Sequence, residues 1–257
     1  MKQGIFTYFI GTAGSGKSTL TGLCKRWMDI RGIDAIIVNL DPGAENLPYD
    51  PDIDIRDWIS LTEVMEAHQL GPNGAQIACA DMLALNTNDI KQSLESFKAD
   101  FIFFDTPGQL ELFVFRESGK YIIDSLKPKK SVVAYLIDQN LAKNPHFFVS
   151  QLLLSLTTNF RLGISQINLL TKSDLLKPDE IDQLVSWASH PDDLESALYT
   201  QKASVYREIN EEIIRLIAHF QSHGPLIPTG ETDYLGVDDL YTTIQLLFSG
   251  GEDVLPD

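Results

Sequence analysis

The sequence predicts an α/β fold in which helices cover both faces of an open, mostly parallel sheet. Short and almost uninterrupted apolar runs recur along the 257 residues, as is typical of strands buried on both faces. Each run is followed by a stretch of helical length, and this rhythm indicates parallel strands joined by helical crossovers. Sheets of this class bind ligands at the carboxyl ends of their strands, so function is expected in the loops that follow the runs.

Five apolar runs predict the first strands. They are residues 5–10 (IFTYFI), 35–40 (AIIVNL), 101–104 (FIFF), 131–137 (SVVAYLI) and 166–170 (QINLL). The clearest helical stretches between them are residues 17–31, 119–126 and 145–161.

From about residue 177 to residue 223 the apolar runs stop and the sequence becomes helical. A strand-like pattern returns in PLIPTG at residues 225–230. We therefore expect one domain, residues 1–257, with a helical insertion at about 177–223 rather than a second independent domain.

The charge balance argues against one class of partner. Acidic residues outnumber basic ones by 36 to 20, a net charge of −16, whereas a nucleic-acid partner needs basic stripes. The few phosphates of a nucleotide can still be bound by backbone N–H groups and one lysine. Two cysteines are too few for a disulfide framework, which favours a cytoplasmic location. The longest uncharged stretch, residues 144–160, falls short of the ~20 apolar residues of a membrane span, so no membrane association is expected.

The segment GTAGSGKST, residues 11–19, matches the motif G-x-x-x-x-G-K-[ST] in full. It lies between a predicted strand and a predicted helix, the context of a phosphate-loop NTPase. Glycines let consecutive N–H groups point at the β-phosphate, and Lys17 reaches the β and γ oxygens. Ser18 offers a hydroxyl to Mg²⁺. The expected phosphate-binding residues are Gly14, Ser15, Gly16, Lys17, Ser18 and Thr19, the last at the α-phosphate.

The segment DTPGQ, residues 105–109, follows the third run and fits the element D-x-x-G. In this element the aspartate, Asp105, holds Mg²⁺ through water, and the amide of Gly108 senses the γ-phosphate. Gln109 stands where a glutamine could orient the attacking water. A plain turn after a strand is the alternative interpretation.

A second carboxylate, Asp41, ends the second run and would lie beside the γ-phosphate if that strand is parallel to the first. It is a candidate for Mg²⁺ and for the attacking water, and the sequence leaves open whether Asp41 or Gln109 positions this water. The acidic residues that follow, Asp50, Asp52 and Asp54, are expected to be solvated in a mobile switch. Tyr49 and Arg56 are expected to order this switch when nucleotide is bound.

The segment TKSD, residues 171–174, follows the fifth run and fits N/T-K-x-D. Asp174 would accept two hydrogen bonds from guanine, and the stem of Lys172 would stack on the base. Adenine offers no matching pair of donors, which makes the discrimination steep. Thr171 replaces the commoner asparagine that braces the loop. Thr229 and Gly230, in the final strand-like segment, are the candidates for an amide contact to guanine O6.

These motifs, together with GPNG at residues 71–74, resemble those of the GPN-loop GTPases, here a short member of the archaeal type. The resemblance covers residues 11–174. It implies a homodimer in which the Gly-Pro-Asn loop of one subunit reaches the nucleotide of the other, so that Asn73 contacts the phosphate end in trans. It also implies Mg²⁺-dependent hydrolysis of GTP to GDP, and a nucleotide-driven switch in the assembly of protein complexes.

Two alternatives stay open. An ATP-dependent phosphate-loop kinase would share the phosphate loop but should lack TKSD. A nucleotide-switched scaffold or chaperone would use hydrolysis only as a timer and could bind protein clients through the helical insertion. Apolar faces at residues 147–160 and 209–220 would serve such clients, although helices of this fold must bury one face in the core.

Overall fold

The computed structural model describes residues 4–126, 130–200, 212–217 and 225–249. Within them lies a seven-stranded sheet with the strand order β3-β2-β4-β1-β5-β6-β7. Every strand pair in it is parallel. The strands are β1 (Ile5–Gly11), β2 (Ala35–Asn39), β3 (Ile53–Asp54), β4 (Phe101–Asp105), β5 (Ser131–Asp138), β6 (Ser165–Thr171) and β7 (Leu226–Pro228). All five apolar runs are therefore strands, as predicted, and the predicted fold class is confirmed.

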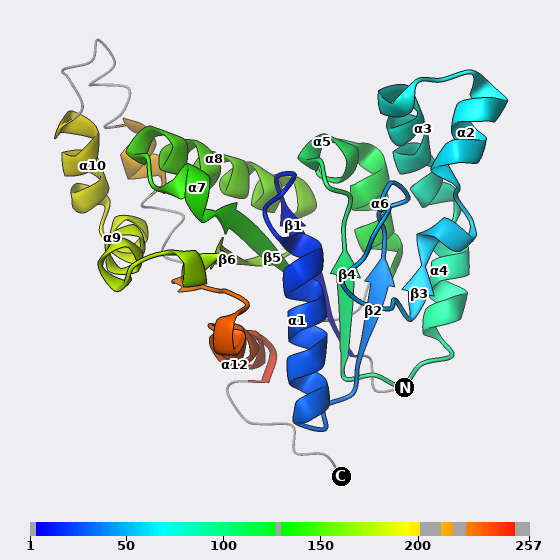
Figure 1. Ribbon diagram of the computed structural model, residues 1–257, viewed down its shortest axis with the longest axis horizontal. Helices are drawn as coiled ribbons and strands as arrows, with labels where there is room; N and C mark the ends of the chain where they lie inside the picture. The colour runs from blue at the N-terminus through cyan, green and yellow to red at the C-terminus, as the bar shows by residue number, and fades with distance from the viewer. Residues whose placement is uncertain (1–3, 127–129, 201–211, 218–224, 250–257) are drawn as a thin grey trace.

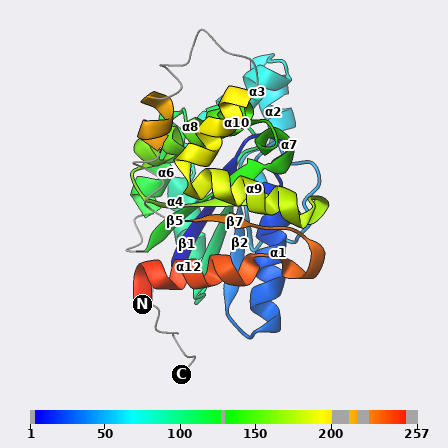
Figure 2. The same cartoon turned by 90° about the vertical axis from the view of Figure 1, so that its left-hand side faces the viewer.

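Helices connect these strands and cover both faces of the sheet (Figures 1 and 2). They are α1 (Lys17–Ile30), α2 (Leu61–His68), α3 (Pro72–Leu85), α4 (Thr87–Leu94), α5 (Leu110–Phe113), α6 (Glu117–Leu126), α7 (Gln139–Ala142), α8 (Pro145–Leu162), α9 (Pro178–Ser189), α10 (Pro191–Thr200) and α12 (Val237–Ser249). Short 3-10 turns lie at Ile55–Asp57, Ser173–Leu175 and Thr232–Tyr234. No helix in the part of the chain that the structure describes is long and apolar enough to span a membrane.

The longer strands send alternate side chains into two separate cores, as the pleat requires. One core lies between the sheet and the helices α1 and α12, and it contains Phe9 and Phe103. The other contains Tyr8 and Phe104 and is covered by helices that include α3, α6 and α8. Because both faces of the sheet are packed against helices, the strand ends that carry the motifs are held in fixed positions relative to one another.

Helices α2 and α3 form a hairpin at the carboxyl end of the sheet (Figure 1). Gly71 precedes α3 in an extended conformation, and Pro72 occupies the first turn, where a missing N–H costs nothing. The Gly-Pro-Asn segment is thus the start of a helix rather than a free loop.

The predicted helical insertion at about 177–223 contains α9, α10 and the helical residues 212–217, and residues 201–211 and 218–223 lie outside the described part. The single domain, residues 1–257, stays a prediction. Helix α8 packs Phe148 and Leu152 into the core, whereas Phe147 and Phe160 are exposed. The apolar face at 147–160 therefore serves mainly as core. Of the face at 209–220 only residues 212–217 lie in the described part, and there Ile214 and Ile217 are buried.

Candidate functional site

The phosphate loop joins β1 to α1, and its shape depends on glycine. Gly14 and Gly16 have φ angles of 75° and 92°, in the left-handed region that other residues rarely adopt. A Cβ atom on Gly11 would lie 2.7 Å from Oγ of Ser15. The loop therefore wraps closely around the amino end of α1, where the helix dipole favours an anion, although the amide of Ser15 donates to the carbonyl oxygen of Thr12 at 3.1 Å.

Lys17, the first residue of α1, lies folded across this loop. Its Nζ donates hydrogen bonds to the carbonyl oxygens of Gly11 (2.9 Å), Thr12 (3.0 Å) and Gly108 (3.1 Å). Burial lowers the pKa of Lys17 to about 8, although the carboxylates of Asp105 and Asp41 act in the opposite direction. A buried ammonium group bound by neutral carbonyls is well suited to exchange them for phosphate oxygens.

Asp105 ends β4 and is almost fully buried. Its Oδ2 accepts a hydrogen bond from the hydroxyl of Tyr49 at 2.7 Å, while Oδ1 has no hydrogen-bond partner among the described residues. Burial raises the pKa of Asp105 to about 6, although the neighbouring hydroxyls of Ser18 and Tyr49 and the charge on Lys17 act in the opposite direction. An unpartnered carboxylate oxygen beside a serine hydroxyl is the kind of hard oxygen set that Mg²⁺ prefers, so Ser18 and Asp105 fit this metal.

Asp41 follows β2 and links the turn at Gly43 to the DTPGQ segment that contains Gly108. Its Oδ1 accepts from the amide of Gly43 at 2.9 Å, and its Oδ2 accepts from the amide of Gly108 at 3.1 Å. The carboxylate thus binds the N–H group that the sequence assigns to the γ-phosphate. Because β2 is parallel to β4 and adjacent to it, Asp41 lies beside the Asp105 motif.

Gln109 has an exposed side chain that contacts α3. Its Nε2 lies 3.5 Å from Oε1 of Gln76, a long hydrogen bond. No motif in the sequence includes Gln76, so its place beside Gln109 has no signal in the sequence.

The TKSD segment is tied to the phosphate loop by two side chains. The hydroxyl of Thr171 donates to the carbonyl oxygen of Ser15 at 2.7 Å, so threonine braces the loop in place of asparagine. Nζ of Lys172 donates to the carbonyl oxygen of Gly14 at 2.7 Å and pairs with Asp138 at 2.6 Å. Asp138, which ends β5, had no sequence signal because its role depends on the neighbouring strand.

Asp174 meets the last strand at the predicted guanine pocket. A Cβ atom on Gly230 would lie 2.5 Å from its Oδ1, so any larger residue would displace the Asp174 side chain. The hydroxyl of Thr232 donates to its Oδ2 at 3.2 Å. A cavity of about 360 Å³ opens beside these residues, a suitable size for a small ligand. Its lining is formed by Gly16, Thr19, Leu20, Leu23, Thr171, Lys172, Asp174, Leu175, Thr229, Gly230 and Glu231.

The expectation that Asp54 is solvated is wrong, whereas Asp52 is exposed, as expected, even though it also makes a hydrogen bond. Asp52 accepts from the amide of Ile37 at 2.8 Å, and Asp54 is bound by Arg56 and Asn39. The reason is that β3, a two-residue strand without a sequence signature, pairs with β2 and draws this segment onto the sheet edge. Asp50 is exposed, as expected.

Asn73 lies apart from the groups described so far. It is exposed in the first turn of α3, and its side chain makes no hydrogen bond to any described residue. The motifs of the phosphate loop, of Asp105 and of TKSD are thus brought together within one chain, whereas Asn73 is presented outward.

Comparisons with known proteins agree with this geometry. The sequence model of a family described as "Conserved hypothetical ATP binding protein" matches residues 9–250. A GPN-loop GTPase of Arabidopsis thaliana is 37% identical over 65% of this chain and 57% of its own length. One of Pyrococcus abyssi is 36% identical over 67% of this chain and 68% of its own length.

A GPN-loop GTPase of Danio rerio is 31% identical over 95% of this chain and 88% of its own length. By contrast, the match to the Arabidopsis relative covers only 57% of that protein's length. The crystal structure of a GTPase from Pyrococcus abyssi in apo form superposes with a TM-score of 0.83, at 29% identity, over 95% of this chain and 98% of that one.

Proposed function

Because the chain belongs to the GPN-loop GTPase family, we propose that it binds GTP at the site described above and hydrolyses it to GDP and phosphate with the help of Mg²⁺. One observation carries this proposal. The hydroxyl of Thr171 and the ammonium group of Lys172 bond to the carbonyl oxygens of Ser15 and Gly14, so the guanine motif and the phosphate motif form one continuous surface.

The choice of GTP over ATP rests on Asp174. Its carboxylate faces the cavity rim beside Gly230, and a carboxylate accepts both the N1–H and the amino group of guanine. Adenine has no donor at N1, so an unpaired carboxylate would oppose its binding. The family description mentions ATP, but this residue favours guanine.

At the phosphate end, we assign the loop amides and Lys17 to the β- and γ-phosphates. Ser18 and Asp105, with Asp41 nearby, would hold Mg²⁺, which neutralises phosphate charge when bound. The oxygen of a water molecule attacks the γ-phosphorus as the bond to the β–γ bridging oxygen breaks, and GDP leaves with that oxygen. Loose transition states of this kind gain mostly from positioning and charge, and Asp41 or Gln109 would orient the water.

We further propose that the active form is a homodimer and that Asn73 completes the partner's site. The support is that Asn73 is exposed on a proline-initiated helix and makes no side-chain hydrogen bond within the described part of its own chain. An amide at this position would donate hydrogen bonds to γ-phosphate oxygens. A role in assembling protein complexes and a cytoplasmic location, consistent with the free cysteines Cys24 and Cys79, complete the proposal.

Turnover by the purified chain tests the proposal. We expect release of phosphate from GTP in the presence of Mg²⁺, little from ATP, and none after chelation of the metal. Lys17→Ala should abolish the activity, and Asp174→Ala should reduce the preference for GTP over ATP. Equal turnover of ATP and GTP by the wild-type chain would contradict the assignment of Asp174.

A further inference from the structure

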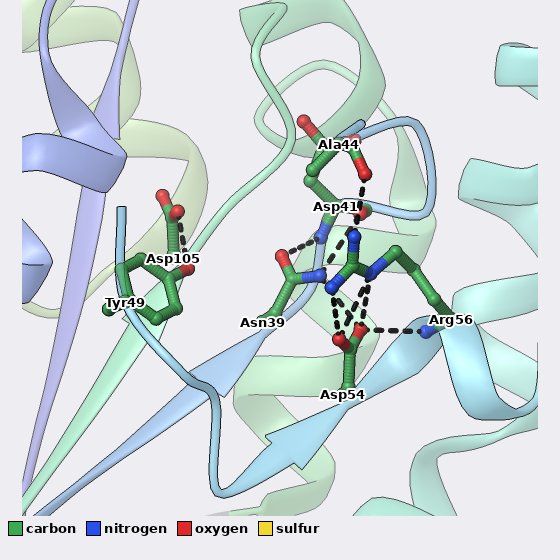
Figure 3. Close-up of polar contacts among 7 residues, drawn as sticks. All are labelled: Asn39, Asp41, Ala44, Tyr49, Asp54, Arg56 and Asp105. Carbon is green, nitrogen blue, oxygen red and sulfur yellow. Dashed lines mark hydrogen bonds and ion pairs between the residues drawn. The ribbon is translucent and has the colours of Figure 1, made fainter. Parts of the chain in front are cut away.

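Asn39 is fully buried and holds the backbone of Asp41 on both sides. Its Nδ2 donates to the carbonyl oxygen of Asp41 at 3.2 Å, and its Oδ1 accepts from the amide of Asp41 at 3.0 Å. The same Nδ2 donates to Oδ1 of Asp54 at 2.9 Å. Asn39 and Asp54 are direct partners in the register of β2 and β3, so the sheet itself sets this contact (Figure 3).

Arg56 extends this network to the turn that follows Asp41. Its Nε and Nη2 bind the Asp54 carboxylate at 2.9 Å and 2.6 Å, and its Nη1 donates to the carbonyl oxygen of Ala44 at 2.9 Å. Burial opposes the ionised form of Asp54, but hydrogen bonds from Arg56 and Asn39 outweigh it and hold the pKa of Asp54 below its ordinary value. The pair is therefore charged at neutral pH.

The consequence is a turn fixed at both ends. Asn39 holds Asp41, Arg56 holds Ala44, and the Asp41 carboxylate closes the turn through the amide of Gly43. With its backbone fixed in this way, the Asp41 side chain is directed at Gly108. Anchoring β3 to β2 would need only the Asn39–Asp54 contact, so the bond from Arg56 to Ala44 points to a second purpose.

We propose that Asn39, Asp54 and Arg56 are positioning residues that hold the Asp41 carboxylate in the orientation needed for GTP hydrolysis. The inference rests on the proposed function, in which Asp41 takes part in that reaction. None of the three touches the reacting atoms. They act through the geometry of residues 41–44, and a displacement of about 1 Å at a catalytic group can cost roughly 100-fold in rate.

Arg56→Gln is the first test. We expect kcat for GTP to fall roughly 10- to 100-fold, while the Kd for GDP stays within about three-fold, because the phosphate loop and the guanine motif are untouched. The kcat of Arg56→Lys should lie between that of the wild type and that of Arg56→Gln. Lysine keeps the charge but lacks the planar fork that reaches both Asp54 and Ala44. Arg215→Gln, which removes an exposed arginine paired with Glu212, is the matched control and should leave kcat unchanged.

A double-mutant cycle with Asp41→Asn separates positioning from general stability. If Arg56 acts through Asp41, Arg56→Gln should cost less than about two-fold in kcat in the Asp41→Asn background, although it lowers Tm equally in both. If Arg56→Gln lowered kcat by the same factor in the Asp41→Asn background as in the wild type, this proposal would be overturned, while the proposed function would stand. An unchanged kcat in Asp41→Asn by itself would overturn the role of Asp41 and with it this proposal. Should Arg56→Gln not fold, Arg56→Lys serves in the same cycle.

Discussion

The hydroxyl of Tyr49 donates a hydrogen bond to Oδ2 of Asp105 across 2.7 Å, although 56 residues separate the two in sequence. The ring of Tyr49 packs on α1 at Gly22, where an added Cβ atom would lie only 3.3 Å from it. Tyr49 thereby closes the loop between β2 and β3 over the carboxylate that is assigned to Mg²⁺ (Figure 3).

Tyr49→Phe removes this hydrogen bond and keeps the ring. We expect the concentration of Mg²⁺ needed for half-maximal GTP hydrolysis to fall roughly 10- to 100-fold, the value of one hydrogen bond to a charged group. The physical reason is that the hydrogen bond from the phenol draws negative charge to Oδ2, so that without it the Asp105 carboxylate binds a cation more strongly. Titration of turnover against Mg²⁺ measures the effect, and Tyr121→Phe, at an exposed position on α6, is the control. A higher requirement for Mg²⁺ in Tyr49→Phe would instead mean that the phenol supports the metal-bound carboxylate.

Gly230→Ala should weaken guanine binding with little effect on the fold. The added methyl group would lie 2.5 Å from Oδ1 of Asp174 and would push the carboxylate away from the base. We expect the Kd for GDP to rise at least about ten-fold, the loss expected when hydrogen bonds to a charged group are broken. Calorimetric titration with GDP checks this, with Asp233→Asn in the next turn as a control. Unchanged affinity in Gly230→Ala would show that Asp174 does not contact the base.

Local patterns predicted most of the sheet. The five apolar runs became β1, β2, β4, β5 and β6 because a strand buried on both faces has few alternatives to a continuous apolar sequence. The exception is β3, which has only two residues and lies within an acidic segment. It forms because its register with β2 places Asp54 opposite Asn39, and this contact has no signal in the sequence of either segment.

The site shows the same division between local motifs and long-range contacts. Motifs such as GTAGSGKST could be identified from the sequence because their residues are consecutive and form one local structure. The residues that were missed, among them Asn39, Asp138 and Thr232, act on partners in other elements. Asp138 pairs with Lys172 only because β5 and β6 are neighbours, and the sequence alone does not give that adjacency residue by residue.

The Asp54 network should make stability depend on acid. The pKa of Asp54 is lower in the folded chain than its ordinary value of 3.8, so its contribution is present above that value and is lost as the pH falls through the folded pKa. The difference in unfolding free energy between the wild type and Asp54→Asn should therefore be constant from pH 7 to about 5 and shrink below about 4. Urea unfolding at several pH values measures it. Asp50→Asn, at an exposed position in the same segment, is the control, and a difference that grows with acid would contradict the assignment.

The trans role of Asn73 predicts complementation between two inactive chains. Lys17→Ala lacks a working phosphate loop but still presents Asn73, whereas Asn73→Ala keeps its own loop and lacks the amide that its partner needs. In a heterodimer purified through two different tags, one of the two sites then has every group in place. Turnover should recover to about half of the wild-type value, since a two-fold dimer has two equivalent sites. Each variant alone should be nearly inactive. A heterodimer as inactive as its parents, or an Asn73→Ala homodimer as fast as the wild type, would mean that Asn73 does not act across the interface.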